Sequence, residues 1–290
     1  MPGKRDLKLK NVKPVFAETQ KVSMSNALTR AAHNLLLSEK RLVMLGIANT
    51  DQMNQVTDNR GWKVRVHAAE YADKFGVDKH TAYDQLKSAS KKIFHRYLHS
   101  AWNGKNGEEE LYFRWVSSAK YQSMEGFVEL NFTPEVVPHL IKLKSRFTSY
   151  KLETTSLFES IYAWRLYEVL LSYVNLRNSK KYSVEEFQEL IEAPPSCCKN
   201  FGMLRRSVIE PAIKGINTHS DIKVAWEPVK KGRKVATINF NFQKNDQLKI
   251  DFNTTDKNRS PAKLTNKYIA DNALPGESYQ QAKDRLARTR

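Results

Sequence analysis

The stretch Val224-Ala-Trp-Glu-Pro-Val-Lys-Lys-Gly-Arg-Lys-Val-Ala-Thr-Ile-Asn-Phe-Asn-Phe242 decides the fold of the second half of this chain. Apolar residues recur at every second position from Ile222 to Trp226, and again from Ala236 to Phe242. This alternation on both sides of a glycine predicts a β-hairpin. Four cations occupy the five-residue tip: Lys230, Lys231, Arg233 and Lys234. Because like charges repel, an anionic partner would stabilise such a tip.

The whole chain is strongly basic. It has 48 Lys and Arg against 31 Asp and Glu in 290 residues, a net charge of +17. Residues 199–234 hold nine of these cations and three of the anions, so the charge is concentrated near the hairpin. Such a balance favours nucleic acid as the partner, and the alternative is a solvated basic surface.

Several other classes of protein are not expected. No run of about 18 apolar residues predicts a membrane span, and the N-terminus lacks the apolar core of a secretory signal. The two cysteines are adjacent, at Cys197 and Cys198, and cannot by themselves complete a structural zinc site. We therefore expect a cytoplasmic protein without metal or cofactor, and its length suggests about two domains.

The segment before the hairpin predicts a helix with one basic face. Apolar residues from Phe201 to Ile216 recur at helical spacing, and Pro211 predicts a kink or a break. Arg205 falls at the edge of the apolar stripe. The opposite face carries Lys199, Asn200, Met203, Arg206, Ser207 and Lys214. Upstream, Ser183 and Glu186 form a capping box that predicts a shorter helix. Helix, turn, basic-faced helix and hairpin together make a winged helix.

The first half repeats this order. Residues 62–67 alternate as a strand, residues 68–75 predict a short helix ended by Gly76, and Asp78 caps a helix from Lys79 to about His95. Residues 111–116 and 126–132 predict two strands, and residues 157–174 a long amphipathic helix. We therefore predict an α+β chain of two tandem winged-helix domains joined by a long helix.

These elements predict four regions along the chain. A basic N-terminal arm covers residues 1–21, the first winged-helix domain residues 22–148, and the second residues 149–242. A basic tail covers residues 243–290, in which residues 274–287 fit a terminal helix.

Five strings in this sequence resemble one family, the replication initiator (Rep) proteins of iteron-containing bacterial plasmids. In chain order they are Val66-His-Ala-Ala-Glu-Tyr-Ala-Asp-Lys-Phe-Gly76, Arg146-Phe-Thr-Ser-Tyr-Lys-Leu152, Tyr162-Ala-Trp-Arg-Leu-Tyr-Glu168, Ile213-Lys-Gly-Ile-Asn217 and the Lys-Lys-Gly-Arg wing. The Tyr-Ala-x-Arg-Leu-Tyr-Glu string is the most specific, and the likeness covers about residues 22–242.

The resemblance implies monomers that bind direct repeats in a plasmid origin (iterons). It also implies a homodimer that binds an inverted repeat at its own promoter and represses it. Host partners would be an initiator ATPase and the replicative helicase, in the bacterial cytoplasm. The alternative is a dedicated transcriptional repressor or partition protein without a role in replication.

The DNA-binding residues follow from this interpretation. A helix fits the major groove, so Arg206 is predicted to read a base, with Arg205, Ser207 and Met203 beside it. Lys199, Asn200 and Lys214 suit phosphates or base edges, and Lys230, Lys231, Arg233 and Lys234 suit phosphates. In the first domain, backbone contacts are predicted for Lys74, Lys79, His80, Lys87 and Lys91. For each of these residues the alternative is a solvated or ion-paired surface side chain.

Enzymatic activity is not expected. The sequence has no His-x-His pair for a rolling-circle initiator, no zinc-protease motif at His95 and His99, and no phosphate-binding Gly-x-x-x-x-Gly-Lys-Ser/Thr loop. Arg165 and Glu168 are interpreted as packing residues that orient the domains, with a phosphate contact by Arg165 as the alternative.

Overall fold

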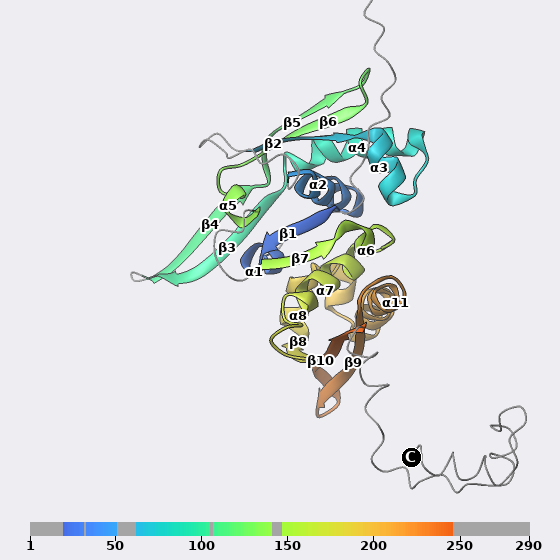
Figure 1. Cartoon of the computed structure of the whole chain (residues 1–290). Helices are drawn as coiled ribbons and strands as arrows, with labels where there is room; N and C mark the ends of the chain where they lie inside the picture. The colour runs from blue at the N-terminus through green and yellow to red at the C-terminus, as the bar shows by residue number, and fades with distance from the viewer. Residues whose placement is uncertain (1–19, 32, 51–61, 105–106, 141–146, 246–290) are drawn as a thin grey trace, which may run out of the picture. The chain divides into compact units, whose positions relative to one another are not determined.

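The computed structural model describes residues 20–31, 33–50, 62–104, 107–140 and 147–245 (Figure 1). The predicted N-terminal arm and basic tail lie almost wholly outside these residues, as does the expected terminal helix. Helices and antiparallel strands alternate through the described part, which gives an α+β fold of two winged helices. No described helix is both long and apolar enough to cross a membrane.

The first winged helix is built on a three-stranded sheet in the order β2-β6-β5. Strands β3 and β4 form a separate hairpin. The elements of this half, in chain order, are β1 (Lys21–Ser25), α1 (Asn26–Arg30), α2 (Leu37–Thr50), β2 (Trp62–His67), α3 (Ala68–Phe75), α4 (Lys79–Ile93), β3 (Tyr97–Gly104), β4 (Gly107–Arg114), β5 (Val116–Gln122), β6 (Phe127–Phe132) and α5 (Val137–Leu140).

The helix pair α3–α4 has the predicted limits. Gly76 ends α3 in the left-handed conformation, at φ 62°, where a residue with a side chain would be strained. Asp78 begins α4, since its side chain accepts a hydrogen bond from the backbone N–H of Thr81. The inner face of α4 is buried, as predicted, through Ala82, Leu86, Ala89 and Ile93.

The prediction of one strand over residues 111–116 was wrong. Strand β4 ends at Arg114 and β5 begins at Val116, and the two belong to different sheets. Between them, the fully buried Trp115 anchors the backbone as it passes from one sheet to the other, and its carbonyl accepts the N–H of Thr133. An alternating pattern cannot reveal this change of sheet, because both strands keep the same period.

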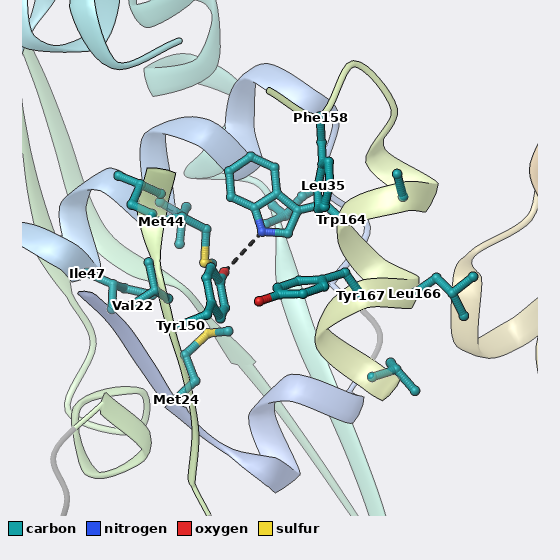
Figure 2. Close-up of a cluster of buried hydrophobic side chains, with 14 of the residues drawn as sticks. Val22, Met24, Leu35, Met44, Ile47, Tyr150, Phe158, Trp164, Leu166 and Tyr167 are labelled. Atoms are coloured by element: carbon teal, nitrogen blue, oxygen red, sulfur yellow. Dashed lines mark hydrogen bonds between the residues drawn. The ribbon is translucent and has the colours of Figure 1, made fainter. Parts of the chain in front are cut away.

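Residues near both ends of the first half pair in a small second sheet. Strand β1 runs antiparallel to β7 (Phe147–Lys151), with Lys21 opposite Lys151. Next come α6 (Leu152–Ser156) and α7 (Ile161–Leu171). Figure 2 shows side chains of α7 packed against this sheet, and the indole N–H of Trp164 donates to the Tyr150 hydroxyl at 3.0 Å.

The helix predicted over residues 157–174 is shorter and is not amphipathic. It begins at Ile161, because the Ser160 side chain caps it by accepting the N–H of Tyr162. Every residue from Ala163 to Leu170 is buried, including Arg165 and Glu168. The prediction of an amphipathic helix was therefore wrong, because both faces of α7 are covered by other elements.

The second winged helix has the predicted order of helix, turn, helix and hairpin, with an additional strand, β8, and an additional short helix, α9. Its three-stranded sheet runs β8-β10-β9. The elements are β8 (Ser179–Ser183), α8 (Val184–Ile191), α9 (Pro195–Cys198), α10 (Phe201–Leu204), a π turn (Arg205–Ile209), α11 (Glu210–His219), β9 (Ile222–Lys231) and β10 (Lys234–Lys244). The capping box of Ser183 and Glu186 and the hairpin β9–β10 are confirmed.

Candidate nucleic-acid interface

Residues 201–219 form one continuous helical segment, made of α10, the π turn and α11, which packs on the sheet and on α7. We call it the recognition segment. Its predicted apolar stripe is buried at Leu204, Val208, Ile209, Ala212, Ile213 and Ile216, and its first residue, Phe201, is half-buried. Asn200 begins the segment, since its side-chain oxygen accepts the N–H of Met203. Burial of this face fixes which residues are left for a partner.

The predicted kink at Pro211 takes the form of a π turn. The backbone N–H of Glu210 donates to the carbonyl of Arg205, five residues earlier, in place of the usual four. Pro211 follows directly and has no N–H with which to continue the ordinary ladder. The wider turn leaves Arg205, Arg206 and Ser207 exposed between the buried Leu204 and Val208.

Most of the predicted site residues on the recognition segment are exposed. Those on the surface are Lys199, Asn200, Arg205, Arg206, Ser207 and Lys214. Met203 is half-buried and packs against the core, and its sulfur lies 3.6 Å from one terminal nitrogen of Arg206. The Arg206 Nε donates to the carbonyl of Gly202 at 3.3 Å, which directs its guanidinium along the exposed face.

Arg205 differs from Arg206 because it already has partners. Its Nε lies 2.7 Å from Glu210 Oε1, and both side chains are about half exposed. Its guanidinium also lies over the Trp226 ring, 5.9 Å from the centroid. Trp226 is on β9, so Arg205 connects the recognition segment to the hairpin.

The hairpin tip presents its cations to solvent. Gly232 has φ 65°, the conformation that the tight turn requires. Lys230, Lys231, Arg233 and Lys234 are all exposed. Within the described residues none of these four forms an ion pair, and neither does Arg206 or Lys214. The recognition segment and the hairpin tip thus carry six exposed cations that have no carboxylate partner among the described residues.

The first-domain candidates fall into two groups. Lys79, Lys87 and Lys91 are exposed on the outer face of α4. Lys74 is largely buried in an ion pair with Glu153, its Nζ 2.7 Å from Oε1. His80 lies 3.3 Å from Asp84, an ion pair only when the imidazole is protonated. Of the five, Lys74 is the only one that is not exposed, since the His80 side chain is 89% exposed despite its contact with Asp84.

Arg165 and Glu168 are packing residues, as predicted, and the alternative of a phosphate contact by Arg165 was wrong. Arg165 is 1% exposed and donates to the carbonyls of Thr29, Ala31 and Leu190. Leu190 belongs to α8 of the second winged helix, whereas the other two follow β1. The guanidinium therefore ties the two winged helices together.

A buried polar network surrounds this arginine, and most of its members could not be predicted from the sequence. Lys40 Nζ lies 2.7 Å from Glu168 Oε2, and the Tyr150 hydroxyl donates to Glu168 Oε1 at 2.6 Å. His33 Nε2 donates to the carbonyl of Leu28, and its Nδ1 accepts from Arg165 at 3.2 Å. Burial and the neighbouring cations hold the pKa of His33 well below its usual value, so the ring is neutral.

The segment after α1 is also held by the second winged helix. Glu192 ends α8 in the left-handed conformation, and its carboxylate accepts the backbone N–H groups of His33 and Asn34.

No group of three or more metal-ligating side chains occurs among the described residues.

Comparison with known proteins identifies the family. A model described as "Initiator Replication protein, WH1" matches residues 21–171, and one described as "Initiator Rep protein, WH2" matches residues 183–242. A "Replication initiation protein" of Escherichia coli is 27% identical over 236 residues, 79% of this chain and 71% of that protein. The "PI protein" of Escherichia coli is 24% identical over 266 residues, 81% of this chain and 86% of that protein.

Among solved structures, the Pi initiator protein in complex with iteron DNA has a similar fold. The match has a TM-score of 0.57 and 22% identity, and covers 80% of this chain and all of that one. Since the first family model alone spans more than half of the residues, this chain belongs to the initiator replication protein family, the Rep initiators of plasmids.

Proposed function

We propose that this chain initiates plasmid replication by binding specific double-stranded DNA. The observation that carries the proposal is the set of six exposed cations on the recognition segment and on the hairpin tip, none of which pairs with a carboxylate of the described residues. A recognition segment fits the major groove, and the flanking wing contacts phosphates. The related Pi initiator protein was solved with iteron DNA, which supports the same kind of partner here.

The roles within the site are proposed as follows. Arg206 reads a base edge, with Ser207 and Met203 beside it, and Arg205 joins them when its ion pair with Glu210 opens. Lys199, Asn200 and Lys214 contact phosphates or base edges. The four wing cations contact phosphates, and Lys79, Lys87 and Lys91 of α4 contact the backbone of neighbouring DNA. The exposed His80 contacts the same backbone, whereas Lys74 reaches DNA only if its ion pair with Glu153 opens.

The division of labour is also a proposal. The first domain, residues 22–148, serves dimerisation and backbone contact, and the second, residues 149–242, reads the sequence. Monomers bind the direct repeats of the origin, and a homodimer binds the promoter's inverted repeat and represses transcription. After binding, the chain recruits the host initiator ATPase and helicase in the cytoplasm, and it acts without catalysis of its own.

A replication assay tests this function against the alternative of a pure repressor or partition protein. A plasmid without its own origin is joined to the DNA that flanks this gene, and the chain is supplied from a second plasmid. We expect stable transformants only when both components are present. Repression of a reporter without any transformants would support the alternative.

A further inference from the structure

We propose that Glu210 is a specificity-determining residue, which limits binding to unspecific DNA by holding Arg205 in an ion pair across the π turn. The inference rests on the proposed function, because it assumes that the recognition segment binds DNA. It begins from an acidic side chain on the same surface as the DNA-binding cations, where a carboxylate repels phosphate.

The π turn makes the ion pair possible. In an ordinary α-helix, side chains five residues apart point about 140° away from each other. Here the N–H of Glu210 donates to the carbonyl of Arg205, and the same wide turn brings Arg205 Nε to 2.7 Å from Glu210 Oε1. The backbone irregularity and the ion pair therefore join the same two residues.

The contact with Trp226 fixes the direction of the arginine. The guanidinium lies 5.9 Å from the ring centroid, and the same ring packs against Phe201 at 6.3 Å. Arg205 is thus held toward β9 by the ring and by Glu210 together. Arg206, the next residue, contacts no carboxylate among the described residues and stays available to DNA.

This arrangement has different consequences for the two kinds of DNA. On unspecific DNA the protein can shift until a released Arg205 meets a phosphate, since that binding is almost entirely electrostatic. On a specific site the base contacts fix one register, so a released Arg205 has one position in which to find a phosphate. Glu210 therefore weakens unspecific binding more than specific binding.

The test compares Glu210→Gln with Glu189→Gln, a matched loss of one negative charge on the exposed face of α8. Binding is measured by salt titration on two duplexes. One is enriched by the wild-type chain from a random library, and the other is its shuffled version. For Glu210→Gln we expect roughly two- to fivefold tighter binding to the shuffled duplex, a steeper salt slope by about 0.9, and a smaller gain on the enriched duplex.

The double variant Arg205→Gln/Glu210→Gln shows whether the ion pair is the mechanism. The extra affinity should disappear in it, because no arginine is left to release. Equal gains on both duplexes, no gain in Glu210→Gln, the same gain in Glu189→Gln, or a gain that persists in the double variant would overturn the proposal. Failure of the wild-type chain to enrich any duplex would instead contradict the proposed function. Thermal unfolding of each variant checks that the fold is intact.

Discussion

Lys40 and Glu168 form an ion pair from which solvent is excluded, with the Lys40 Nζ 2.7 Å from Glu168 Oε2 and both side chains 0% exposed. Lys40 is on α2 and Glu168 is on α7. The second carboxylate oxygen accepts from the Tyr150 hydroxyl, so both oxygens of Glu168 are satisfied. Burial lowers the pKa of Lys40, and Glu168 opposes this by favouring the charged ammonium.

Removal of one partner should therefore destabilise the fold strongly. Glu168→Gln leaves an uncompensated ammonium in the interior, and we expect a loss of about 3–5 kcal/mol in the free energy of unfolding. The measurement is urea denaturation of the full chain. Lys40→Met/Glu168→Met is the matched control: with no charge left unpaired, it should recover much of the loss. Equal losses in the single and double variants would show that the unpaired charge is not the cause of the lower free energy of unfolding.

Stability should fall in mild acid because of His33. Its folded-state pKa lies well below the usual value of 6.5, owing first to burial and then to Arg165 and Lys40. Below about pH 6.5 the unfolded chain binds a proton at this residue that the folded chain does not. The contribution of His33 to the free energy of unfolding is therefore fully present above this pH and is lost as the pH falls below it. The loss approaches about 1.4 kcal/mol per pH unit for this residue.

The check is the difference in unfolding free energy between the wild-type chain and His33→Gln from pH 7 to 5. Other titratable groups are common to both proteins, including His139, whose pKa is also lowered by burial. We expect a shallower acid dependence for His33→Gln. Parallel curves would mean that His33 is protonated equally in both states.

Local signals in the sequence were enough to predict the main elements of the second winged helix. The capping box at Ser183, the alternation around Gly232 and the apolar stripe of residues 201–216 each depend on near neighbours, and each is confirmed. Pro211 indicated an irregularity, but not that it would be a π turn, because this depends on how both flanking helices pack.

Contacts between distant residues could not be predicted in the same way. Strand β1 pairs with β7 across more than 120 residues, and Lys40 meets Glu168 across 128 positions. A lysine on a helix is ordinarily exposed, so nothing local marks Lys40 as buried. The ion pairs of Lys74 and Arg205 agree with the alternative of an ion-paired side chain, but their partners, Glu153 and Glu210, were not predicted.

Arg206→Ala should weaken sequence preference as well as affinity. Loss of a base contact costs about 1–3 kcal/mol on the preferred duplex and relaxes the preference at one base pair. Arg233→Ala on the hairpin tip is the control, because a phosphate contact is lost equally on all sequences. Binding of both variants is measured on preferred and shuffled duplexes. An equal decrease on the two duplexes for Arg206→Ala would make it a phosphate contact.

We expect the chain to dimerise through the exposed strand β4. It pairs only with β3 among the described strands, and Leu111 and Tyr112 are 42% and 58% exposed. An edge of this kind offers unpaired backbone groups to a second copy, and lysine on an edge prevents such pairing. Leu111→Lys/Tyr112→Lys should therefore shift the chain toward monomer in sedimentation equilibrium. Leu176→Lys, at a 72% exposed leucine elsewhere, should leave the equilibrium unchanged. A dimer that survives in the double variant would contradict this edge.

Neutralising the hairpin tip should weaken binding to every DNA sequence by a similar factor. The variant replaces Lys230, Lys231, Arg233 and Lys234 with Gln. Each lost phosphate contact reduces the slope of log affinity against log salt by about 0.9, so four contacts would remove roughly 3–4 units. The preference for the enriched over the shuffled duplex should change little, since phosphates carry no direct sequence information. The fold should survive, because Ile238, Phe240 and Phe242 keep the buried face of β10, and circular dichroism checks this. An unchanged salt slope would show that the tip faces solvent or a protein partner, and the assignment of the hairpin as a DNA-binding wing would then be wrong.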